Sequence, residues 1–136
     1  MVDVVASLNL EDITFRSFTV FDKTVNKEHT FSIKAMKTIP MFLTISKNKV
    51  TRYFSSDPPR LQQIYKGEGF TDADAGFYIK KLLIGLENGG LELRNLIDGK
   101  NIKMLPGVHT RVMGVVYLQH MEFFAPSGDK LVKIFD

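Results

Sequence analysis

Short segments of alternating apolar and polar residues, separated by turn residues, run through most of this 136-residue chain. Residues 29–38 alternate in this way, which is the pattern of a strand with one buried face. Residues 41–54 predict a hairpin that turns near Lys47-Asn48, and Asp98-Gly99 is the strongest hairpin dipeptide in the chain. The pattern predicts about eight strands joined mostly by hairpins, and such connections produce antiparallel sheets.

The middle of the chain predicts one principal helix over residues 72–87. Thr71 is a suitable N-cap, and Asp72 and Asp74 carry negative charge where the helix dipole is positive. The apolar residues that follow have helical spacing: Ala75, Ile79, Leu82, Leu83 and Leu86. An alternative hairpin centred on Asn88-Gly89 stays open, because this dipeptide is also a strong turn signal.

These elements predict an α+β fold that is mainly antiparallel β, with the principal helix inserted mid-chain. The whole chain, residues 1–136, has the length of a single domain. A small curved sheet or an OB-like barrel fits the order of the elements, and the OB analogy rests on that order alone. Gly114 would bend one long strand over residues 110–124, as barrels require at their corners.

The composition excludes several classes of protein. The chain has no cysteine, so it has no disulfide, no thiolate nucleophile and no cysteine-based zinc site. No apolar run approaches the roughly 18 residues of a membrane helix. The first residues, MVDVVASLNLED, lack the basic leader of a signal peptide. We therefore expect an intracellular protein with no membrane partner, in the cytoplasm or nucleus, or in a host cell if its origin is viral.

Neither catalysis nor metal binding has a recognisable motif in this sequence. His29, His109 and His120 are far apart and belong to no metal-binding spacing. Gly67 and Gly69 lack the third glycine of a dinucleotide-binding loop. We therefore expect a protein that is not an enzyme and that uses no cofactor and no metal.

The positive charge is concentrated in one stretch of the chain. No Asp or Glu lies between His29 and Ser56, although the net charge of the whole chain is only +3. Basic residues beside aromatic rings suit single-stranded DNA or RNA, because the charges bind phosphates and the rings stack on bases. We expect such binding with little sequence preference. The predicted contact residues are Lys34, Lys37, Phe42, Lys47, Lys49, Arg52 and Tyr53, with Arg111 and Tyr117 extending the groove.

A structural or assembly protein, including one of viral origin, is the alternative. Such a protein would form homo-oligomers through its strand edges, and strand addition uses main-chain hydrogen bonds that leave little sequence motif. Salt separates the two hypotheses, because phosphate contacts weaken steeply as salt rises whereas strand pairing responds little.

Overall fold

The computed structural model describes residues 3–9, 14–20, 30–36, 39–108, 110–118, 123–128 and 132–135, and for the first two ranges the backbone alone. Within these ranges the protein is all-β and contains no helix. The strands are β1 (Asp3–Asn9), β2 (Thr14–Val20), β3 (Thr30–Ala35), β4 (Met41–Ser46), β5 (Lys49–Phe54), β6 (Arg60–Lys66), β7 (Phe70–Gly76), β8 (Lys81–Leu86), β9 (Leu91–Asn95), β10 (Asn101–Leu105), β11 (Gly114–Leu118) and β12 (Phe123–Ser127).

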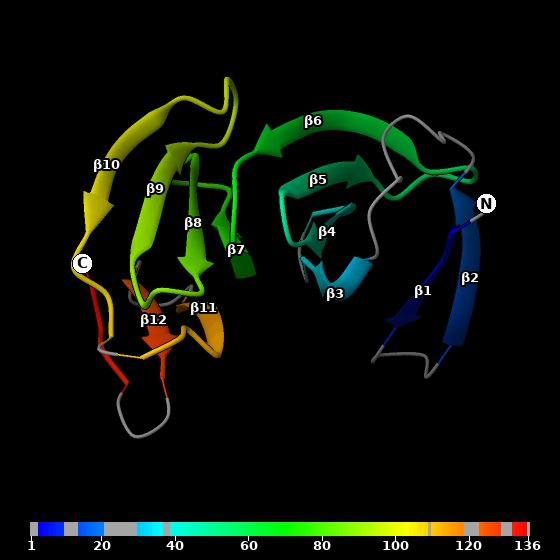
Figure 1. Ribbon diagram of the computed structural model, residues 1–136. Helices are drawn as coiled ribbons and strands as arrows, with labels where there is room; N and C mark the ends of the chain where they lie inside the picture. The colour runs from blue at the N-terminus through cyan, green and yellow to red at the C-terminus, as the bar shows by residue number, and fades with distance from the viewer. Residues whose placement is uncertain are drawn as a thin grey trace.

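Within each sheet, strands that follow one another along the chain pair with one another, always antiparallel (Figure 1). Strands β3 to β6 form one four-stranded sheet, called the first sheet below, and β7 to β10 form the second sheet. Strands β11 and β12 form the third sheet, and β1 pairs with β2 as a separate hairpin. Each sheet has two open ends and none closes on itself, so the predicted OB-like barrel is wrong.

The sheets repeat along the sequence. Their first strands, β3, β7 and β11, begin at residues 30, 70 and 114, which are intervals of 40 and 44 residues. Both edge strands of the first sheet carry a β-bulge, with Phe31 as the extra residue of β3 and Gln62 as that of β6. The second sheet has its bulges 40 residues later, at Thr71 on β7 and Ile102 on β10. The first two sheets are therefore copies of one structural unit.

The predicted helix over residues 72–87, and with it the α+β class, is wrong. Strand β7 ends at Gly76, the chain turns through Lys80, whose φ is 53°, and β8 returns antiparallel. The alternative hairpin is confirmed, because β8 pairs with β9 around Asn88-Gly89. Helical spacing misled the prediction because β8 is buried on both faces, and a doubly buried strand loses its period of two.

Of the other local predictions, two hairpins are confirmed and one long strand is wrong. The hairpins at Lys47-Asn48 and Asp98-Gly99 are confirmed as β4–β5 and β9–β10, and Gly99 has the positive φ of 74° that favours glycine in such turns. The single long strand over residues 110–124 is wrong. Gly114 opens a short strand, β11, which pairs with β12 instead.

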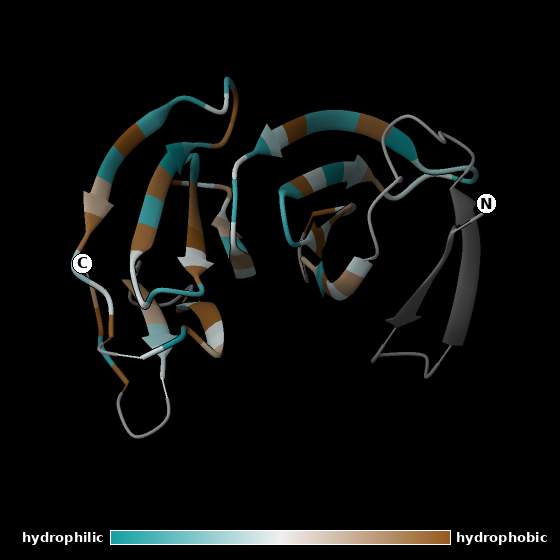
Figure 2. Ribbon diagram, in the orientation of Figure 1, coloured by the Kyte–Doolittle hydropathy of each residue, from teal (hydrophilic) through white to brown (hydrophobic). Residues whose placement is uncertain are grey.

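Two hydrophobic cores hold the sheets face to face. The core between the first and second sheets contains Leu43, Ile45, Val50 and Tyr65 from the first sheet, and Ala73, Ala75, Leu82 and Ile84 from the second. The core between the second and third sheets contains Leu83, Leu91, Leu93, Val115 and Phe124. Apolar and polar residues alternate along β6, β9 and β10, as Figure 2 shows. Strand β8 contributes to both cores and lies at the centre of the stack.

Candidate functional site

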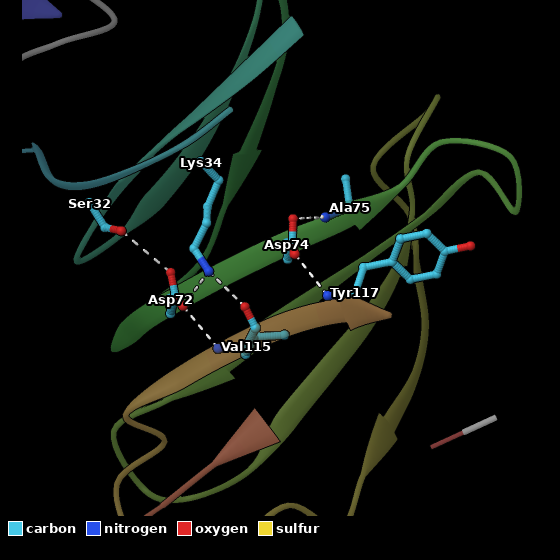
Figure 3. Close-up of polar contacts among 7 residues, drawn as sticks. All are labelled: Ser32, Lys34, Asp72, Asp74, Ala75, Val115 and Tyr117. Carbon is cyan, nitrogen blue, oxygen red and sulfur yellow. Dashed lines mark hydrogen bonds and ion pairs between the residues drawn. The ribbon is translucent and has the colours of Figure 1, made fainter. Parts of the chain in front are cut away.

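Polar side chains join the first strands of all three sheets (Figure 3). Ser32 and Lys34 come from β3, Asp72 and Asp74 come from β7, and the backbone of β11 completes the set. Residues two apart on a strand share a face, so both aspartates lie on the side of β7 that faces β11. We call this set of contacts the inter-sheet polar network.

Asp72 lies at the centre of the network. Its Oδ2 is 3.0 Å from the Lys34 Nζ and accepts a hydrogen bond of 2.9 Å from the Val115 N–H. Its Oδ1 is 3.5 Å from the hydroxyl of Ser32. The Lys34 ammonium also donates to the Val115 carbonyl at 2.7 Å, so this one lysine of β3 contacts both β7 and β11. The Asp72 side chain is only 9% exposed, against 25% for Lys34, and a charge buried to that extent needs such partners.

Asp74 makes a second set of contacts one step along β7. Its Oδ2 accepts a hydrogen bond of 2.8 Å from the Tyr117 N–H, and its Oδ1 accepts one of 2.9 Å from the Ala75 N–H. Burial raises the pKa of the Asp74 carboxyl above its ordinary value of 3.8. The Tyr117 N–H and the positive charge of Lys34 offset only part of this rise in pKa, because both favour the ionised form.

The network closes an otherwise unpaired strand edge. Strand β11 pairs with β12 on one side only, and alternate residues of such a strand direct their N–H and C=O groups away from the partner. At Val115 and Tyr117 these groups bind Asp72, Asp74 and Lys34. The two carboxylates thus take the place of a neighbouring strand. Because both accept backbone hydrogen bonds from β11, they indicate a structural contact between sheets rather than a reactive centre. In the part of the chain that the structure describes, no cluster of His, Asp or Glu could hold a metal ion.

Three of the predicted nucleic-acid contacts are buried. Phe42 and Tyr53 are each 2% exposed, and their rings stack on one another with centroids 5.1 Å apart. Arg52 is 8% exposed and lies on the opposite face of β5, where its Nη1 is 3.7 Å from the Met41 sulfur. Because both rings are buried, neither is accessible for stacking on a nucleic-acid base.

The remaining predicted contacts do not gather on one surface. Lys34 belongs to the inter-sheet polar network, and Tyr117 packs against Phe124 with ring centroids 5.1 Å apart. Lys37 lies outside the described residues. Lys49 is half-buried at the start of β5. The structure therefore distributes these residues over several faces of the first and third sheets.

Lys47 lines one open depression of about 610 Å³, and Arg111 contacts a residue of its lining, Glu87. It lies where the β4–β5 turn, the β6–β7 loop and the β8–β9 turn meet. Glu68 and Glu87 also line it, and Glu87 is 3.8 Å from the Arg111 guanidinium. The acids offset the bases there, so this surface lacks the single positive sign that phosphate binding favours.

The sequence analysis does not identify the two aspartates of the inter-sheet polar network as a site. The sequence pattern predicts that Asp72 and Asp74 begin a helix, where residues two apart face different directions. In a strand the same spacing gives two carboxylates on one face. The repeat of about 40 residues was missed too, because its traces are bulge positions, and these follow backbone pairing rather than residue type.

The fold defines a class: all-β proteins built from repeated four-stranded antiparallel sheets stacked face to face. Four-stranded sheets repeated every 40 to 45 residues or so are the pattern of propeller blades. The chain contains no tryptophan, so the Trp-Asp dipeptide that marks one such family is absent. Within the described residues, no helix is long and apolar enough to cross a membrane.

Comparisons with known proteins show a likeness of fold. No protein-family model and no curated protein matches the chain. The solved structures of two computationally designed proteins do match it. Ika8 has a TM-score of 0.63 at 11% identity, over 79% of this chain and 33% of its own. Ika4 has a TM-score of 0.61 at 10% identity, over 79% of this chain and 65% of its own. The chain thus spans a third of the length of the first and less than two thirds of the second, and at this identity the likeness concerns the fold alone.

Proposed function

We propose that this protein is a non-catalytic assembly protein, a propeller-type scaffold that associates with other copies of itself through its sheet faces. The observation that carries the proposal is the outward face of the third sheet. Three apolar side chains are exposed there: Val116 by 49%, Val132 by 69% and Ile134 by 58%. A cluster of exposed aliphatic side chains on one sheet face is typical of an interaction surface.

The strand register places these residues on one face. Val115, Tyr117 and Phe124 pack into the core against the second sheet, so Val116 between them points outward. The bridge from Ser127 to Val132 and the bridge from Phe124 to Phe135 continue the sheet, which puts Val132 and Ile134 on the same outward side. We call this surface the forward face of the third sheet.

Faces fit the proposal better than edges do. Bulges interrupt both edge strands of the first two sheets, and bulged edges resist the addition of another strand. The outer strand β10 also carries Lys103, and β6 carries Arg60 and Lys66. Charges of one sign on both outer edges disfavour pairing between them. Homo-oligomers formed through strand edges, as the sequence analysis expected, are therefore less well supported than homo-oligomers formed through faces.

Nucleic-acid binding, the main expectation from the sequence, stays a prediction. Its support is weaker than before, because Phe42 and Tyr53 are buried and Lys34 is paired. The absence of an enzymatic role and a viral origin likewise remain predictions. We base the proposed function on the packing surfaces instead.

Sedimentation of the purified protein at low and high salt tests the proposed function. We expect the average mass to rise with protein concentration and to change little with salt, because apolar contacts are not screened. Fluorescence anisotropy with a labelled oligothymidine should give no salt-sensitive binding. A protein that stays monomeric at every concentration, or that binds the oligonucleotide at low salt while remaining monomeric, would overturn the proposal.

A further inference from the structure

We infer that the copies associate head to tail: the forward face of the third sheet of one copy docks on the exposed side of β3 in the next. This inference rests on the proposed function and specifies which surfaces meet. The exposed side of β3 carries Phe31 and Ile33, which are 45% and 39% exposed. Ser32 and Lys34 reach Asp72 on the second sheet, so the alternation of the strand turns Phe31 and Ile33 away from that sheet.

The chain already contains this contact twice. Strand β3 packs against β7, and β7 packs against β11, so each first strand meets the first strand of the next sheet. One side of each strand therefore faces forward along the series and the other faces backward. Among the side chains that the structure describes, the series leaves two such sides exposed: the forward side of β11, with Val116, and the backward side of β3, with Phe31 and Ile33. Docking β11 of one copy on β3 of another repeats the internal step.

The chemistry of the two exposed sides is matched. At the internal contacts, the forward-facing positions hold Lys34 on β3 and Asp74 on β7. Lys34 pairs with Asp72 on β7, and Asp74 accepts a hydrogen bond from the Tyr117 N–H on β11. On β7, the forward-facing Asp74 follows the core residue Ala73. On β11, Val116 follows the core residue Val115 in the same way, so Val116 is the corresponding forward-facing position. An uncharged forward side suits the apolar side of β3, because neither surface would bury an unpaired charge.

A second copy of this chain is thus the partner that both surfaces fit. The contact joins two different surfaces, so it is heterologous, and such contacts form closed rings or open filaments according to the rotation between copies. A symmetric dimer would instead bury one surface against itself. This difference makes the inference testable by mixing variants.

The experiment uses two variants of the full chain, each with one blocked surface. Val116→Lys with Ile134→Lys blocks the forward face, and Phe31→Lys with Ile33→Lys blocks the β3 side. Each variant should lose self-association by tenfold or more, because each lacks one of the two required surfaces. Met104→Lys is the matched control, since Met104 is 55% exposed but lies on the outer strand β10. This control should sediment as the wild type does.

Mixing the two blocked variants in equal amounts gives the decisive result. Each retains the surface that the other lacks, so the mixture should form a one-to-one dimer that grows no further. Circular dichroism and thermal unfolding check that both variants fold, and Phe31→Lys alone serves if the double variant does not. No dimer in the mixture, from a wild type that does associate, would overturn the head-to-tail contact but leave the proposed function standing. A wild type that is monomeric throughout would overturn both.

Discussion

Lys34 on β3 and Asp72 on β7 form an ion pair of 3.0 Å between two sheets, and the same lysine donates to the Val115 carbonyl on a third. One ammonium group thus touches the first strand of every repeat in the stack. The pair is largely shielded from water, and Asp72 is the more deeply buried partner. Asp72 also accepts hydrogen bonds from the Val115 N–H and the Ser32 hydroxyl, so it serves three donors, whereas Lys34 serves two acceptors.

Replacing Asp72 should therefore cost more stability than replacing Lys34. Asp72→Ala leaves the Lys34 ammonium and the Val115 N–H without their acceptor, and we expect a loss of about 3 kcal/mol in the free energy of unfolding. Lys34→Met leaves Asp72 bonded to Val115, and about 1 kcal/mol should be lost. Urea unfolding of both variants measures the difference. Equal losses would show that the hydrogen bond to the strand edge contributes little.

Asp74 should make stability fall as the pH rises through the mildly acidic range. Burial raises the folded-state pKa of Asp74 above 3.8, so the folded protein holds this proton more tightly than the unfolded chain does. The resulting stabilisation is complete below the unfolded pKa and is lost as the pH rises through the folded pKa.

Asp74→Asn removes this titration. The difference in unfolding free energy between the variant and the wild type should therefore shift in favour of the variant as the pH rises from about 4 towards neutrality. Urea unfolding over a pH series follows this difference, which cancels the titration of all other groups. Parallel pH profiles for the two proteins would contradict the prediction.

Arg52 should be replaceable without loss of stability. Its side chain is buried, its Nε has no hydrogen-bond partner, and the guanidinium contacts the Met41 sulfur and the Tyr65 hydroxyl, neither of which carries a compensating charge. Replacing a buried charge that lacks a carboxylate partner with an apolar residue of similar length is commonly neutral or stabilising. We expect Arg52→Met to leave the thermal unfolding midpoint unchanged or to raise it. Marked destabilisation would show that the guanidinium has a partner of structural importance.

Leu83 and Val116 form a matched pair of aliphatic residues with opposite burial. Leu83 is fully buried between the second and third sheets, so Leu83→Ala should cost about 2–5 kcal/mol of unfolding free energy. Val116 is half-exposed, and Val116→Ala should change the stability of the monomer by less than about 0.5 kcal/mol. Chemical unfolding at a dilution that favours monomers measures both. A large effect of Val116→Ala there would place that residue in the core.

The sequence predicted local pairing better than it predicted the global arrangement. Asp98-Gly99 and Lys47-Asn48 were recognised as turns because turn conformations restrict residue type directly. Leu82, Leu83 and Leu86 have helical spacing and predict a helix face wrongly, since a strand packed on both sides has no polar face to mark its period. Burial of Phe42 and Tyr53 depends on packing against their sheet face, which composition and charge do not report.

The capped edge of β11 also gives the protein an internal reporter of sheet docking. The amide protons of Val115 and Tyr117 are bonded to side chains of the second sheet rather than to β12. Their exchange with deuterated water should therefore follow the separation of the third sheet from the second, whereas the amides that pair with β12 follow the opening of the hairpin itself. Two neighbouring classes of amide along a five-residue strand thus distinguish undocking from unfolding.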